Sequence, residues 1–157
     1  MFRKTHHVLV VCYIIATLLL LSYTKKPSEL TKYEFLLLGM IGQALLFHIS
    51  YHIYKSQQIW YSFYMYALIY ILYILSFTSI DMYLYLENSM NFTGRIYKDV
   101  HKMFIDFVYV NFCTVSTMGY SDITPNTTTT RSYSSYKIAI AIFMIVFLIS
   151  DINIKTK

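Results

Sequence analysis

The chain has 157 residues, of which 57% are hydrophobic, 18% aromatic and 13% charged, and its formal net charge is +5. Soluble domains carry about 25% charged residues, so this composition excludes an ordinary soluble protein and favours insertion in a lipid bilayer. The 13 Lys and Arg residues are scattered without a basic run, which argues against nucleic-acid binding and is typical of the flanks of membrane spans.

The N-terminal part of the chain, residues 1–56, predicts a pair of transmembrane helices over about residues 8–23 and 35–54. The first apolar stretch follows a short basic segment and lies near the lower length limit of a spanning helix. A cleaved signal peptide has the same layout. We favour a retained helix, because no small-residue cleavage site follows the apolar stretch.

The second apolar stretch contains two glycines and two histidines with informative spacing. Gly39 and Gly42 remove side chains from one region of the helix and permit close approach of a neighbouring helix. His48 and His52 share one helical face, which is compatible with a metal site or a proton sensor. Packing against neighbouring helices is the simpler explanation, since no third ligand is visible, so no metal site is expected.

Residues 57–157 predict a second unit, which opens with a long aromatic-rich helix over residues 59–85. A helix of this length, about 40 Å, exceeds the hydrocarbon core of a bilayer. Asp81 interrupts the apolar stretch late, so we expect the helix to tilt or to emerge from the membrane near Asp81. The polar connection that follows contains a glycosylation sequon at Asn91.

The next segment indicates a re-entrant loop. An apolar helix over residues 103–114 is too short to span, a polar stretch follows, and residues 132–153 are again long enough to cross. Lipid does not tolerate exposed irregular backbone, so a polar stretch at membrane depth must be enclosed by protein or line a water-filled path. The expected fold class is an all-α membrane protein with transmembrane helices, a re-entrant helix and a loop beside a hydrated axis.

The polar stretch from Thr114 to Asp122 reads Thr-Val-Ser-Thr-Met-Gly-Tyr-Ser-Asp. It resembles the selectivity filter of the potassium channel pore-domain family, which reads Thr-x-Thr-Thr-Val-Gly-Tyr-Gly-Asp. Met118 replaces the usual valine and Ser121 replaces the second glycine, so this chain carries a Gly-Tyr-Ser variant of the pattern. The resemblance implies a potassium-channel-like tetrameric pore made of an outer helix (59–85), a pore helix (103–114), a filter (117–121) and an inner helix (132–153).

The resemblance also implies roles for single residues. Main-chain oxygens of the filter would bind the permeating ions, and the filter residues are Thr117, Met118, Gly119, Tyr120 and Ser121. The pore mouth and the support of the filter would be formed by Asp122, Tyr109, Thr114 and Ser116. Asp151, near the end of the inner helix, could form a ring of charge at the inner mouth or lie in water at a helix end.

The implied function is a potassium-channel-like cation channel that conducts passively through backbone carbonyls. No arginine repeat is present, so voltage sensing is not expected, and Met118 and Ser121 are expected to reduce K+/Na+ selectivity. A single pore segment requires a homotetramer, or a heteromer with other channel subunits. No enzyme activity, resident metal or cofactor is expected beyond permeating potassium ions. The alternatives are a non-conducting subunit that modulates other channels and a membrane adaptor with an accidental filter match.

The sequence leaves the inner helix and the orientation partly open. One apolar face of the inner helix could line the conduction path or pack against a neighbour, and it comprises Ile138, Ala141, Ile142, Ile145 and Ile149. The resemblance places the filter toward the outside of the membrane. The distribution of Lys and Arg does not support this orientation, because these residues are more numerous in the segments that it places outside.

Overall fold

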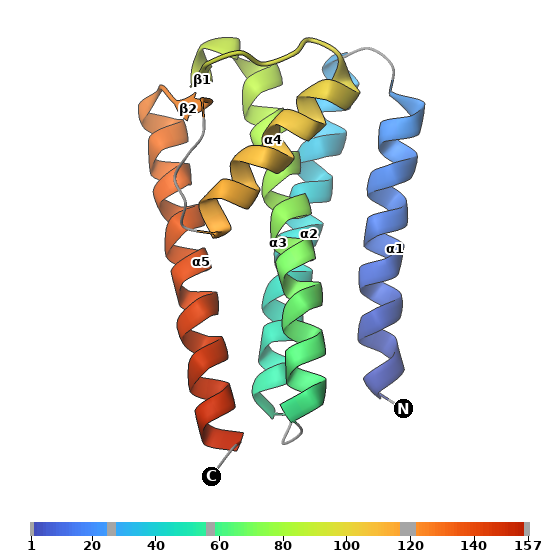
Figure 1. Ribbon diagram of the computed structural model, residues 1–157. Helices are drawn as coiled ribbons and strands as arrows, with labels where there is room; N and C mark the ends of the chain where they lie inside the picture. Colours follow the sequence, from blue (N-terminus) through green and yellow to red (C-terminus); the bar gives the residue numbers. More distant parts are fainter. Residues whose placement is uncertain (1, 25–27, 56–58, 117–121, 156–157) are drawn as a thin grey trace.

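The computed structural model describes residues 2–24, 28–55, 59–116 and 122–155, with side chains over residues 7–24, 28–53, 64–116 and 122–151. The described residues form the helices α1 (Phe2–Tyr23), α2 (Glu29–Lys55), α3 (Ile59–Glu87), α4 (Val100–Val115) and α5 (Thr128–Lys155). A short 3-10 turn η1 (Ser89–Asn91) and two-residue strands β1 (Phe92–Thr93) and β2 (Thr124–Pro125) complete the fold. In Figure 1, α1, α2, α3 and α5 run along one bundle, and α4 crosses α3 obliquely and ends beside α5.

Three of the described helices are long and apolar enough to cross a membrane, and their spans are Glu29–Ile53, Tyr64–Glu87 and Thr128–Asp151. The apolar part of α1 is shorter, over His7–Tyr23, as expected from its sequence. Helix α2 begins earlier than the sequence indicated, because Ser28 caps it. The Ser28 hydroxyl accepts a hydrogen bond from the Thr31 backbone N–H at 3.2 Å.

The two glycines of α2 lie where α2 and α3 pack most closely. A side chain at Gly39 would collide with Ile80 of α3. A Cβ atom at Gly42 would lie 2.5 Å from the Tyr13 hydroxyl of α1 and 2.5 Å from Ser76 Cβ of α3. The expected close helix approach at both glycines is therefore confirmed, and it joins α1, α2 and α3 at one level.

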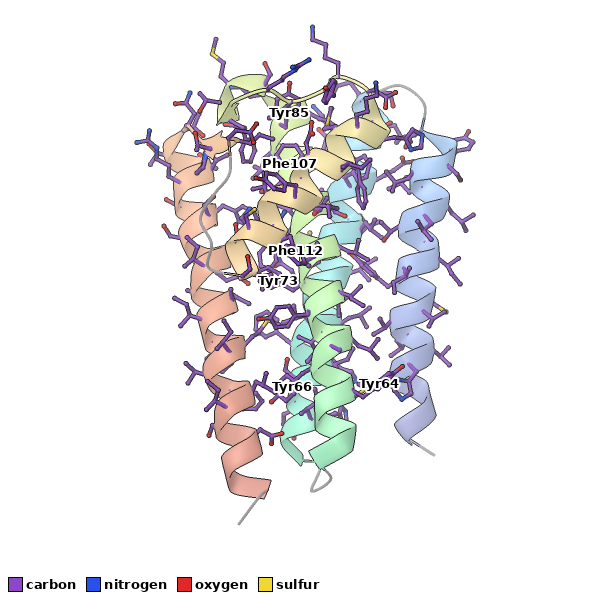
Figure 2. All side chains as sticks on the ribbon, in the orientation of Figure 1. Tyr64, Tyr66, Tyr73, Tyr85, Phe107 and Phe112 are labelled. Carbon is purple, nitrogen blue, oxygen red and sulfur yellow. The ribbon has the colours of Figure 1, made fainter. Side chains whose placement is uncertain are left out.

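The hydrophobic core has two parts. The larger part fills the bundle between α1, α2, α3 and α5. Tyr66 and Tyr73 of α3 belong to it, and Figure 2 shows both side chains between α3 and α5. The second part supports α4, where the Phe107 ring lies 6.0 Å from Tyr85 and 5.1 Å from Phe92 between ring centroids. The core of α4 is thus continuous with the end of α3.

Strands β1 and β2 join two connections that are distant in sequence. They pair antiparallel, with Phe92 opposite Pro125 and Thr93 opposite Thr124. The Thr93 and Thr124 hydroxyls also share a hydrogen bond of 2.7 Å. The loop before α4 is therefore fixed to the segment that precedes α5, and we call this end of the bundle the β1–β2 end. The expected all-α membrane class is confirmed, with this short strand pair added to it.

Candidate functional site

Helix α4 is a half-length helix whose two ends lie at different depths of the bundle. The Asp99 carboxylate caps its first turn by accepting a hydrogen bond from the Lys102 backbone N–H at 3.1 Å. Its 16 residues extend over about 24 Å, less than the roughly 30 Å of a hydrocarbon core. In Figure 1, α4 begins at the β1–β2 end and ends near mid-height, while β2 and the start of α5 lie back at the first end. The helix before residues 117–121 therefore enters the bundle from the β1–β2 end, and the chain after these residues returns to the same end.

Helix α4 has two apolar faces, and its own chain covers one of them. The buried face comprises Met103, Phe107 and Val110. The exposed face comprises Ile105, Tyr109 and Phe112. A helix that ends inside a membrane and continues into polar chain needs protein around it, because lipid cannot satisfy irregular backbone. The exposed face is therefore suited to contact with another protein chain.

The last turn of α4 is held by hydrogen bonds to its own backbone. The Thr114 hydroxyl donates to the Val110 carbonyl at 2.9 Å, and the Ser116 backbone N–H donates to the Phe112 carbonyl at 3.0 Å. The Ser116 hydroxyl also donates to the Cys113 carbonyl at 3.3 Å. Thr114 and Ser116 thus complete the helix end, while the five expected filter residues, 117–121, lie outside the described residues.

The chain after the filter-like stretch is supported by Gly94. Asp122 is exposed and Ile123 is buried. Gly94 has a φ of 119°, and an added Cβ would collide with the Asp122 carbonyl oxygen and lie 3.0 Å from Ile123 Cα. Both the positive φ and the lack of space require glycine at this position. The loop before α4 therefore packs directly against the backbone that leaves the filter-like stretch.

Asn91 fastens the same loop to α3 and α5. Its main-chain oxygen accepts hydrogen bonds from the Asn126 N–H at 2.9 Å and the Thr130 hydroxyl at 2.8 Å. Its side-chain oxygen accepts from the Thr127 hydroxyl at 2.8 Å, and its amide nitrogen donates to the Leu84 carbonyl at 2.7 Å. Asn91 is buried, so in the folded chain its amide nitrogen is engaged by protein and its sequon is not an accessible modification site.

Tyr109 lies within electrostatic reach of the pore-mouth residue expected from the sequence. Its hydrogen bond with the Cys113 side chain raises the pKa of the Tyr109 phenol, and the charge of Asp122 adds to the increase. The phenol is exposed on the face of α4 that its own chain leaves uncovered. The direct contact between Tyr109 and Asp122 stays a prediction.

A buried polar cluster joins α3, α4 and α5 behind the end of α4. Lys137 Nζ of α5 lies 2.7 Å from Asp81 Oδ2 of α3, with the two side chains 2% and 0% exposed. Asn111 of α4 donates to the same carboxylate oxygen at 2.7 Å and accepts from Lys137 Nζ at 3.1 Å. We call Asp81, Asn111 and Lys137 the buried cluster. It is the polar contact among the described side chains that links all three helices.

Within the described part of the single chain, the hydrogen bonds of the Asp81 carboxylate all go to Oδ2, and Asp81 Oδ1 is buried without a hydrogen-bond partner. The second N–H of the Asn111 amide donates to the Phe107 carbonyl at 2.9 Å, and the Thr78 hydroxyl lies 3.3 Å from the same nitrogen. Lys137 Nζ lies 5.6 Å from the centre of the Tyr133 ring, a distance that permits a cation–π contact. Paired charges with such partners can be buried, whereas an isolated charge at this depth is strongly unfavourable.

Asp81 is enclosed by protein, and whether the outer helix tilts or emerges from the membrane at this end stays a prediction. Asp81 is fully buried, and α3 continues to Glu87. In the sequence, Asp81 is recognisable only as an interruption of an apolar stretch, so its contacts with Asn111 and Lys137 were not predicted. A signal was present: Asp81 and Lys137 both fall inside helices that the sequence predicts to span the membrane, over residues 59–85 and 132–153. Intramembrane charges of opposite sign usually pair with one another.

Helix α5 leaves much of its surface uncovered in the single chain. Only 17% of its spanning segment is buried, against 56% for α3. Of the face expected to line the path, Ile138, Ile142 and Ile149 are exposed. Ala141 is instead buried in the core of its own chain, which agrees with packing, the second alternative that the sequence left open for this face. The exposed residues can face a conduction path or a neighbouring chain.

Asp151 lies near the other end of the bundle and packs within its own chain. Its side chain is buried. A helix end in open water, one of the two alternatives from the sequence, does not describe this environment. Whether Asp151 contributes charge to an inner mouth stays a prediction.

His48 and His52 form a pair of rings on α2. Their centroids lie 4.7 Å apart at an interplanar angle of 65°. The Tyr51 ring lies 5.7 Å from His52. Among the described residues, no group of three His, Cys, Asp or Glu side chains could hold a metal ion. The arrangement is one of aromatic packing on a helix surface.

The fold and the site define an integral, multi-pass membrane protein with a re-entrant helix between its last two spans. Residues 66–157 match the sequence profile of a family described as "Ion channel". This match covers more than half of the chain, so the chain belongs to that ion-channel family. Comparison with curated proteins and with solved structures gave no match.

Family membership fixes the broad activity of the chain. The matched region includes most of α3 and all of α4, residues 117–121 and α5, the elements that the sequence resemblance also identified. The predicted potassium-channel-like pore family is thereby confirmed. Channels of this family act as oligomers, and membership points to passage of ions rather than to catalysis. Helices α1 and α2 lie outside the matched region.

Proposed function

We propose that four copies of this chain form a cation channel of the potassium-channel type. The path would be lined by main-chain carbonyls of residues 117–120 and by the Thr117 hydroxyl, which replace water around a dehydrated cation. The observation that carries this proposal is the position of α4, a half-length helix that ends at mid-depth and is followed at once by the filter-like sequence. Family membership supports the same activity.

The direction of α4 favours cations. Its C-terminal end, at Val115 and Ser116, points toward mid-depth of the bundle. A helix carries about half a negative charge at this end, and four such ends directed at one axis would attract a cation in a low-dielectric surrounding. Asp122, exposed beyond the filter-like stretch, would add negative charge at the mouth.

The uncovered faces of α4 and α5 support assembly. Ile105 and Phe112 of α4 and Ile142 of α5 are exposed in the single chain, although each is a large apolar side chain. Lipid can cover α5, but it is unsuited to a helix that ends next to polar backbone. Contacts with neighbouring copies around a fourfold axis would cover both faces. The sequence contains one filter-like segment, so a ring of carbonyls needs four chains.

The filter variant would reduce selectivity between potassium and sodium. Ser121 replaces a glycine, and a left-handed backbone at a non-glycine residue costs roughly 1–2 kcal/mol. Met118 replaces a stiff β-branched residue, so the filter would be less rigid. Helix α5 is continuous and the sequence has no glycine within it, so opening would not use a glycine bend. Voltage sensing is not part of this proposal, because the sequence has no arginine repeat.

Single-channel recording of the purified full chain in planar bilayers tests the proposal. We expect cation currents from the natural sequence and their loss in Gly119→Ala, because a Cβ at this position would strain the filter backbone. Silence of the pure protein, together with altered currents when it is co-expressed with another channel, would favour a non-conducting modulatory subunit. A monomer in native mass spectrometry would favour a membrane adaptor.

A further inference from the structure

Asn111 is the residue through which α4 contacts both flanking helices by polar bonds. Its amide nitrogen donates to Asp81 of α3 at 2.7 Å, and its amide oxygen accepts from Lys137 of α5 at 3.1 Å. The side chain is fully buried. Leucine has a similar volume but can make neither bond. The polar amide, rather than the volume of the side chain, therefore specifies these contacts.

The charged partners of Asn111 fix each other along the bundle axis. Asp81 Oδ2 and Lys137 Nζ are 2.7 Å apart and inaccessible to water. A shift of α5 by one helical turn, about 5.4 Å, would separate them and leave two unpaired charges in an apolar surrounding. The pair therefore selects one axial register of α5 relative to α3. The Asn111 amide fixes α4 to that register.

The cluster is close to the end of α4, where the filter-like stretch begins. Asn111 lies one helical turn before Val115 and Ser116, and Thr117 follows directly. A cavity of about 180 Å3 lies between α4, β2 and α5, and both Thr114 and Lys137 line it. The end of α4 is therefore not packed on all sides within its own chain. A shift there would be transmitted along the chain to the filter.

We propose that Asn111 is a positioning residue for ion conduction. The Asp81–Lys137 pair fixes, through the Asn111 amide, the end of α4 from which the filter starts. This inference rests on the proposed function, because the end of α4 matters for permeation only where residues 117–120 line the path. A purely structural role would give a different result: loss of the amide would then lower stability and leave permeation unchanged.

Tyr73→Phe provides a matched control. The Tyr73 hydroxyl is buried and donates to the Lys137 carbonyl at 2.8 Å, so it also joins α3 to α5. Its removal leaves the polar bonds of Asn111 in place. Asn111→Leu removes those bonds and leaves the Asp81–Lys137 pair. Both variants therefore lose buried hydrogen bonds between helices, but only Asn111→Leu removes the bonds that hold α4.

The test measures hydrogen exchange of the Phe112–Ser116 amides and the K+/Na+ permeability ratio from bi-ionic reversal potentials. We expect Asn111→Leu to speed exchange in this segment about tenfold, equivalent to about 1.4 kcal/mol, and to change the permeability ratio while the oligomer stays intact. Tyr73→Phe should lower the melting temperature and leave both readouts at the natural values. The inference would be overturned if Asn111→Leu kept either the natural exchange rate or the natural permeability ratio, or if Tyr73→Phe had an equal effect.

A second variant keeps the test decisive if Asn111→Leu does not fold. Asp81→Leu/Lys137→Met replaces the charged pair with apolar side chains and removes both charged partners of Asn111, a type of exchange that proteins often tolerate. The double variant should fold and show the same faster hydrogen exchange of the Phe112–Ser116 amides. If these amides exchanged as slowly as in the natural chain, the inference would be overturned. If the natural chain passes no current, the proposed function fails, but the exchange comparison still decides whether Asn111 positions α4.

Discussion

Replacing one member of the Asp81–Lys137 pair should destabilise the fold more than replacing both. The perturbations are Asp81→Leu, Lys137→Met and the double variant. Each single change leaves the partner charge buried without a counter-charge, whereas the double change leaves a neutral apolar contact. The two residues are therefore expected to be strongly coupled in a double-mutant cycle.

The structure gives the magnitude. At 2.7 Å, and with an effective dielectric constant of about 20, the attraction between the two charges is about 6 kcal/mol before the cost of removing them from water. Loss of one partner from a buried pair typically costs about 3–5 kcal/mol. The double variant still leaves the Asn111 amide with fewer partners, so we expect it to cost about 1–2 kcal/mol.

The assay is reversible unfolding in mixed micelles titrated with a denaturing detergent and followed by far-ultraviolet circular dichroism. The predicted coupling energy between Asp81 and Lys137 is about 3 kcal/mol or more. Tyr73→Phe serves as the control, because it removes one neutral buried hydrogen bond and should cost about 1 kcal/mol. If each single variant lost less than about 1 kcal/mol of unfolding free energy, and the double variant lost the sum of the two, the pair would behave like an exposed ion pair and this prediction would be wrong.

Three further predictions concern substitutions that remove or introduce a glycine. Gly94→Ala should destabilise the fold by about 2 kcal/mol and weaken protection of the Ile123 amide in hydrogen exchange, because the residue has a positive φ and lies against the Asp122 carbonyl; natural stability would contradict this. Gly39→Leu should cost about 1–3 kcal/mol in the same unfolding assay, since a side chain would meet Ile80 where α2 and α3 cross. Ser121→Gly should raise the K+/Na+ permeability ratio in bi-ionic recordings, and a lower or equal ratio would count against a strained filter.

Much of the membrane architecture could be predicted from the order of apolar and polar segments. The half-length apolar segment that became α4 was recognisable because its length is too short to span while its polar continuation lies between two long spans. The close approach at Gly39 and Gly42 was predictable for a local reason, since absence of a side chain permits contact with any neighbouring helix. These features depend on composition and length within one segment.

The buried cluster and the Asn91 network were not predicted, because they depend on contacts between distant segments. Asn111 looked like an interruption of an apolar run, and only the packing of α3 against α5 shows why an amide is needed there. Asn91 looked like a modification site, yet four hydrogen bonds enclose it once the end of α3 meets the start of α5. Periodicity along one helix contains no information about which polar groups will meet across helices.

The central claim is that main-chain oxygens from four copies of residues 117–120 hold a dehydrated cation on a common axis. A structure of the assembled protein with bound thallium, located by its anomalous scattering, tests this claim most directly. We expect ion density on a fourfold axis, at the depth where α4 ends and level with the carbonyls of these residues. An assembly without a fourfold axis, or with thallium absent from the axis and this segment directed away from it, would contradict the account.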